Sequence, residues 1–149
     1  MKEHKNIQHF INEIRDTPNL PIDLFIEEFC EVNQIELADI NKYKGKVKGS
    51  PSASGTIRNN FNIHCSMCKF LLFWCIRHKY VEKYKERDGF YPYEKIAKEI
   101  CPDSPVRRPT AYYCVSMAND FLLINDKRFR KLYDTTISNL YKFDISNLD

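Results

Sequence analysis

Histidine and cysteine gather in one short part of the chain, and both are zinc ligands. His64, Cys65, Cys68, Cys75 and His78 include a C-x2-C pair and a C-x2-H pair. If this stretch is one helix, Cys65 and His78 lie about 19 Å apart along its axis. Zinc–sulfur bonds are about 2.3 Å long, so these side chains cannot meet at one ion unless the helix breaks. Neither glycine nor proline interrupts the stretch, and we therefore predict no metal site.

Packing is the simpler explanation for the cysteines. A free cysteine behaves as a small hydrophobe, whereas a disulfide framework needs an oxidising compartment. The N-terminus does not have the apolar block of a signal peptide, so we expect an intracellular protein with reduced thiols. A metal or redox role is the alternative. Five cysteines fall on or beside apolar stripes: Cys30, Cys68, Cys75, Cys101 and Cys114.

Enzyme motifs are absent from the sequence. It contains no G-x-S-x-G, H-E-x-x-H, P-loop or G-x-G-x-x-G pattern. Cys65 with His64 or His78 is a conceivable nucleophile and base, but neighbouring residues on a helix point about 100° apart. The small residues 50–56 resemble a phosphate-cradling loop only in flexibility, because the Gly-Lys-Thr ending is missing. We predict no catalytic activity and no cofactor.

Charge is distributed unevenly, although the net charge is only +3. Residues 1–39 hold three basic and nine acidic side chains, whereas residues 40–81 hold eight basic side chains and no acid. This polarity favours an anionic partner for the middle segment. The alternative is that the acidic N-terminal part folds against the basic middle. Within the Gly/Ser-rich stretch 41–60 we predict a basic arm that contacts phosphates through Lys42, Lys44, Lys46, Lys48 and Arg58.

A second basic region surrounds the helical stripe that begins near residue 110. Arginine binds phosphate or reads guanine, and Thr and Tyr hydroxyls bind phosphate oxygens. In a helix-turn-helix motif, such residues lie at the start of the recognition helix. Here the turn is longer than usual and no wing hairpin is visible, so three successive amphipathic helices with a solvated arginine pair are the plainer alternative. The predicted contacts to the duplex are Arg107, Arg108, Thr110, Tyr112 and Tyr113, with Arg128 and Arg130 in a further basic cluster.

Apolar residues recur at helical spacing along most of the chain, and no segment shows strand-like alternation. The run Phe70–Ile76 is apolar on all sides, which indicates a buried central helix. Asp126 is a suitable N-cap for the last helix. We predict an all-α bundle of six or seven helices with a helix-turn-helix-like C-terminal part. The stripes predict helices over residues 7–14, 22–30, 35–40, 61–87, 92–101, 114–122 and 129–141.

These patterns divide the chain into an acidic N-terminal helical pair (1–40), a basic linker (41–60) and a helical core (61–149). We predict a non-catalytic protein that binds nucleic acid, most simply double-stranded DNA. The alternative is a helical interaction module that binds a partner protein or a second copy of itself. The nine tyrosines and ten phenylalanines favour this alternative, because tyrosine is enriched at interfaces. No apolar run reaches 18 residues, so we expect no membrane span.

Overall fold

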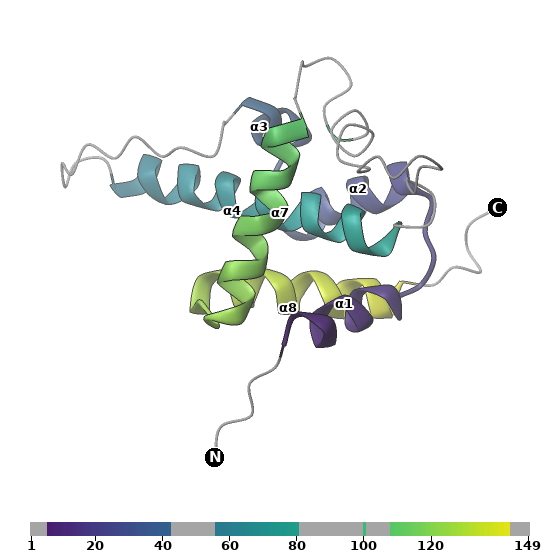
Figure 1. Ribbon diagram of the computed structural model, residues 1–149. Coiled ribbons are helices and arrows are strands. Elements are labelled where there is room, and N and C mark those ends of the chain that lie inside the picture. The colour runs from purple at the N-terminus through teal and green to yellow at the C-terminus, as the bar shows by residue number, and fades with distance from the viewer. Residues whose placement is uncertain (1–5, 43–55, 81–99, 101–107, 144–149) are drawn as a thin grey trace.

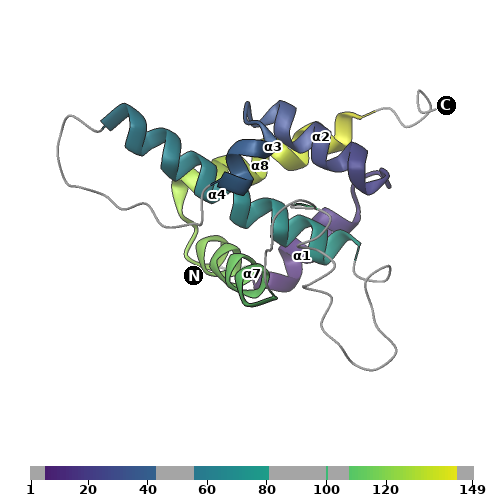
Figure 2. The ribbon, with the colours of Figure 1, turned by 90° about the horizontal axis from the view of Figure 1, so that it is seen from above.

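The computed structural model describes residues 6–42, 56–80, 100 and 108–143 of the chain. Within these residues it contains six helices and no strand, which confirms the predicted all-α class. Helix α4 runs through the middle of the structure, and α7 crosses it steeply (Figures 1 and 2). The helices are α1 (Ile7–Arg15), α2 (Ile22–Val32), α3 (Leu37–Lys42), α4 (Thr56–Lys79), α7 (Arg108–Leu123) and α8 (Lys127–Lys142).

The hydrophobic core surrounds α4, as its all-round apolar segment predicts. Every residue from Phe70 to Ile76 is buried, and α4 contacts each of the five other described helices. Trp74 is fully buried and packs edge-to-face on Tyr133 of α8, with ring centroids 5.9 Å apart. Tyr133 in turn meets Phe10 of α1 at 5.3 Å. The acidic N-terminal helices therefore share one core with α4 and α8.

The C-terminal end of α4 is tied to the connection between α1 and α2. The amine of Lys79 donates to the Thr17 hydroxyl at 2.7 Å and to the Thr17 carbonyl at 2.9 Å. The hydroxyl of Tyr80 donates to the Leu20 carbonyl, and Nε of Arg15 donates to the His78 carbonyl at 3.0 Å. Burial lowers the pKa of Lys79 below its ordinary value, and the two Thr17 oxygens compensate for part of the lost hydration. These bonds hold the C-terminal end of α4 against the α1–α2 connection.

The observed bounds of α4 differ from the prediction of a helix from Phe61 to about Arg87. The helix begins five residues earlier, at Thr56, and ends at Lys79. Of the five residues before Phe61 only Ile57 is apolar, which is too little to extend the stripe, so the onset is not visible in the periodicity. At the other end, the side chains of Lys79 and Tyr80 bind the α1–α2 connection. Residues 56–60, predicted to be part of the linker, are thus helical.

Two helices end in the same way, with one residue in the left-handed region. Gln34 has φ 54° after α2, and Asn125 has φ 57° after α7. After α2, the amide of Ile35 donates to the Cys30 carbonyl and that of Gln34 to the Glu31 carbonyl. This is the Schellman pattern, and it satisfies the last carbonyls of the helix. Asparagine tolerates the left-handed region, but glutamine has no such advantage.

Replacing Gln34 by glycine is therefore expected to stabilise the protein. Glycine removes the Cβ clash at positive φ, and the expected gain in the free energy of unfolding is about 1 kcal/mol. Asn125→Gly is the matched control, since asparagine already accepts this conformation, and its effect is expected to be smaller. Urea denaturation of both variants measures the difference. A loss of stability in Gln34→Gly would contradict the strain assigned to this residue.

None of the described helices combines the length and the apolar character needed to cross a bilayer.

Candidate functional site

The start of α8 carries more positive charge than a helix N-terminus normally holds. Asp126 caps the helix, and its carboxylate accepts from the Phe129 amide at 2.9 Å, as predicted. The next turns carry three exposed cations, Lys127, Arg128 and Lys131, which we call the basic face of α8. The helix dipole disfavours cations at this end. Among the described residues, none of the three forms an ion pair or a hydrogen bond, so their charges are available to an anion.

Arg130, the other predicted arginine of this cluster, has a structural role. Its Nε donates to the carboxylate of Asp134 at 3.2 Å, and its guanidinium lies 5.0 Å from the ring centre of Phe10. It also lies 5.8 Å from the ring centre of Tyr133. Cation–π contacts of this kind hold the side chain across α1 and α8. We therefore separate Arg130 from the basic face.

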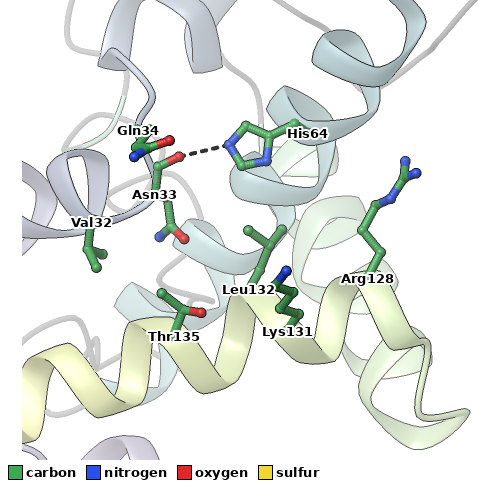
Figure 3. A pocket seen from close by; sticks show the side chains of 8 residues that line it. All are labelled: Val32, Asn33, Gln34, His64, Arg128, Lys131, Leu132 and Thr135. Carbon is green, nitrogen blue, oxygen red and sulfur yellow. Dashed lines mark hydrogen bonds between the residues drawn. The ribbon is translucent and has the colours of Figure 1, made fainter. Parts of the chain in front are cut away.

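A hollow of about 520 Å³ opens beside the basic face (Figure 3). It lies between the end of α2, the first half of α4 and the start of α8. On α8, its lining residues 128, 131, 132 and 135 follow the i, i+3, i+4, i+7 spacing of one helical face. The lining consists of Val32, Asn33, Gln34, His64, Arg128, Lys131, Leu132 and Thr135.

His64 joins α4 to the end of α2 at the rim of this hollow. Its Nε2 lies 2.8 Å from the carbonyl oxygen of Asn33. A carbonyl can only accept, so Nε2 carries the proton in this bond. The other ring nitrogen, Nδ1, points toward the α8 side of the hollow (Figure 3). The histidine thus has one nitrogen committed to the fold and one that faces the site.

Asn33 forms part of the wall between α2 and α8. Its Nδ2 donates to the Phe29 carbonyl and to the Thr136 hydroxyl, both at 3.0 Å. Its Oδ1 is buried and has no hydrogen-bond partner in the part of the chain that the structure describes. A buried acceptor without a donor costs roughly 1–3 kcal/mol. The wall of the hollow therefore holds an unsatisfied polar atom.

A second hollow of about 340 Å³ lies on the other side of Lys131. Its lining includes Lys127, Arg130, Asp134 and Thr135. Lys131 and Thr135 line both hollows, so the basic face runs along a ridge between two depressions. Such a surface offers successive contacts to an extended polyanion.

The cysteines and histidines of α4 do not form a reactive site in the described residues. Cys68 Sγ lies 3.6 Å from His64 Nε2, but that nitrogen already donates to Asn33. Burial raises the pKa of Cys68, and burial together with Asp39 raises that of Cys65 to about 11. Both are therefore neutral thiols at pH 7, and thiolate is the nucleophilic form.

The cysteines pack as small hydrophobes. Cys68, Cys75 and Cys114 are buried and Cys30 is half-buried, which confirms their predicted places in the core, and Cys65 is buried too. Cys101 lies outside the described residues. Over residues 6–42, 56–80, 100 and 108–143, no three His, Cys, Asp or Glu side chains are grouped closely enough to hold a metal ion.

Among the described residues, the predicted nucleic-acid contacts on α7 and α8 do not form one cluster. Tyr112 and Tyr113 are exposed on the first half of α7. Leu123 ends α7 ten residues after Tyr113, which is about 15 Å along the axis, and the basic face of α8 lies beyond it. Lys42 belongs to α3, Arg58 to the start of α4, and Arg108 and Thr110 to the start of α7. Lys44, Lys46, Lys48, Arg107 and the predicted helix 92–101, apart from the buried Ile100, lie outside the described residues.

Most residues of the hollow were not predicted to be part of a site. Arg128 was predicted, and His64 was considered only as a metal ligand or base. Val32, Asn33 and Gln34 follow no recognisable motif, because they meet α8 only through the tertiary fold. A signal for Lys127 and Lys131 did exist in the sequence. Four basic residues in the first five positions of a helix oppose the dipole, and this opposition indicates an anionic partner.

No protein-family model, curated protein or solved structure matches this chain. The function therefore has to be inferred from the chemistry of this surface.

Proposed function

We propose that this protein binds nucleic acid without catalysing a reaction, and that the basic face of α8 contacts the phosphate backbone of a DNA duplex. The observation that carries the proposal is the presence of three exposed cations, Lys127, Arg128 and Lys131, at a helix N-terminus, with no ion-pair partner among the residues that the structure describes. Phosphate contacts from lysine and arginine supply most of the affinity of sequence-independent binding. The partial positive charge of the helix N-terminus adds to the attraction.

The helix-turn-helix arrangement is part of this proposal in a modified form. Tyr112 and Tyr113 are exposed on α7 and are suitable for contacts with phosphate or sugar. They lie at the opposite end of α7 from the basic face, so a single compact site does not include both. In the proposal, α8 provides the main electrostatic contact and α7 a secondary one. The arm residues Lys44, Lys46 and Lys48 add further charge.

Removing the basic face is expected to weaken duplex binding and its salt dependence. In a Lys127→Gln, Arg128→Gln, Lys131→Gln triple variant, the slope of log K against log salt should decrease by about 2.7, because each lost phosphate contact removes about 0.9. Fluorescence anisotropy with a mixed-sequence duplex, titrated from about 50 to 200 mM salt, measures the slope.

The matched control is a variant that removes one positive charge at the other end of the same helix. Lys142 is exposed in the last turn of α8, and Lys142→Gln removes the same charge as Lys127→Gln. We expect Lys127→Gln to lower affinity and Lys142→Gln to leave it nearly unchanged. Equal effects of the two substitutions would mean that only net charge matters, and the proposed site would then be wrong.

A protein-binding module is the second candidate, and one observation favours it. The turn between α7 and α8 exposes two large aliphatic side chains, Leu123 at 51% and Ile124 at 70%. Apolar residues at such exposure are typical of contact surfaces when they form a patch. Size-exclusion chromatography with light scattering distinguishes the candidates. A nucleic-acid-free dimer that dissociates in Ile124→Asp would favour protein association over the DNA proposal.

A further inference from the structure

We infer that the hollow between α2, α4 and α8 is a binding site for a nucleoside monophosphate. This goes beyond contact with a duplex backbone, because the ligand is a free small molecule and its site includes parts of three helices. The phosphate would lie at Arg128 and Lys131, and the base would lie against Val32 and Leu132. The inference depends on cations, an apolar wall and polar groups in one cavity.

The cations account for the phosphate end of the ligand. Arg128 and Lys131 are three residues apart on α8, so they leave the same side of the helix, and both line the hollow; the guanidinium of Arg128 is directed away from Lys131 (Figure 3). An arginine can bind two phosphate oxygens at once, and a lysine adds a point charge. Neither has an intramolecular partner among the described residues. A phosphate would therefore bind without first displacing an ion pair.

The wall of the hollow provides the contacts for the sugar and the base of the ligand. Val32 and Leu132 provide apolar surface, while Asn33 and Gln34 provide amide groups. A volume of about 520 Å³ falls in the range of small-molecule sites and is much larger than a single phosphate requires. Inorganic phosphate alone would leave the apolar wall and the amides unused. A phosphate attached to a sugar and a flat ring uses all three kinds of surface.

The wall of the hollow also holds polar groups, a buried amide and a histidine ring. Asn33 is only 5% exposed, and its Oδ1 has no donor in the described part of the chain. The amide points from the end of α2 toward α8, within the lining of the hollow (Figure 3). His64 Nδ1 faces the same space. An amino group or hydroxyl of a nucleoside is a donor from which His64 Nδ1 can accept, directly or through an ordered water.

Amide and histidine NMR resonances provide the test in the intact chain, with AMP, adenosine and inorganic phosphate as probes. AMP is expected to shift the His64 ring and Gln34 amide resonances saturably at millimolar concentration or below. Adenosine and phosphate should each bind roughly tenfold more weakly, because each lacks one half of the contacts. Phosphate that binds as tightly as AMP would overturn the assignment, as would shifts that do not saturate.

Two variants separate this site from duplex binding. Thr135→Trp fills the hollow from an exposed position and retains every cation, so AMP binding should be lost while duplex affinity persists. Lys127 does not line this hollow, so Lys127→Gln should weaken duplex binding and leave AMP affinity unchanged. Unchanged AMP binding in Thr135→Trp with a native circular dichroism spectrum would overturn the inference. Arg128→Gln tests the phosphate contact without added bulk: it should weaken AMP binding roughly tenfold and, because Arg128 belongs to the basic face, should weaken duplex binding as well.

Discussion

Trp74→Ala is expected to lower the free energy of unfolding by roughly 3–5 kcal/mol, the usual loss for a large aromatic side chain deleted from a core. Trp74 is fully buried in the second half of α4, and its Nε1 donates to the amide oxygen of Asn119 on α7 at 2.8 Å. It also packs on Tyr133, which meets α1. The deletion would therefore leave a cavity where three helices meet and an acceptor without its donor.

Trp74→Phe separates these two contributions. Phenylalanine retains most of the ring packing but cannot donate to Asn119, so we expect a loss of about 1–2 kcal/mol from the missing hydrogen bond and the smaller ring. Trp74 is the only tryptophan, so unfolding should be followed by far-UV circular dichroism rather than by fluorescence. A loss of less than about 1 kcal/mol in Trp74→Ala would contradict the placement of this residue in the core.

Acid is expected to destabilise the protein through His78. Burial, together with the nearby cations Arg77 and Arg15, lowers the pKa of His78 from 6.5 to about 3. The unfolded chain therefore binds a proton below pH 6.5 that the folded protein accepts only near pH 3. Stability from this residue is fully present above pH 6.5 and is lost as the pH falls toward 3. Between pH 6.5 and pH 4.5 the expected loss is roughly 2 kcal/mol.

A His78→Phe variant should lack this part of the pH dependence. His78 packs against Trp74 at 4.9 Å between ring centroids, and its Nε2 has no hydrogen-bond partner in the described residues, so an apolar ring suits the position. His9→Ala is the control, because His9 is exposed and its loss should leave the acid sensitivity intact. Urea denaturation at several pH values measures the curves. Parallel curves for the parent and His78→Phe would show that this histidine is not buried in a neutral form.

Local patterns predicted the helices well and their ends less well. The apolar stripe around Phe10 and Ile14 locates α1, because a helix buried on one side has apolar residues at helical spacing. The all-apolar run from Phe70 locates the buried part of α4, because a helix buried on all sides is apolar all round. The end of α4 depends on Lys79 binding Thr17, a residue 62 positions away, and no window of sequence contains that contact.

The site was less predictable than the fold, because its residues come together only through contacts between distant parts of the sequence. Arg128 was recognised by residue type alone, and the predicted role of Arg130 changed once its contacts with Asp134 and Phe10 were known. Asn33 lies 103 residues from Thr136 in the chain, yet the two share a hydrogen bond at the edge of the site. The one local signal for a site at the start of α8 was its group of basic residues, because the helix dipole disfavours positive charge at a helix N-terminus.

The most direct test of nucleic-acid binding is a heteronuclear NMR titration of the intact protein with a short DNA duplex at low salt. We expect the largest amide shifts over residues 127–131, and we expect them to diminish as salt is raised, because phosphate contacts are displaced by ions. Smaller shifts are expected at Tyr112 and Tyr113. Shifts absent from the start of α8, or binding insensitive to salt, would contradict the proposal that this basic face contacts DNA.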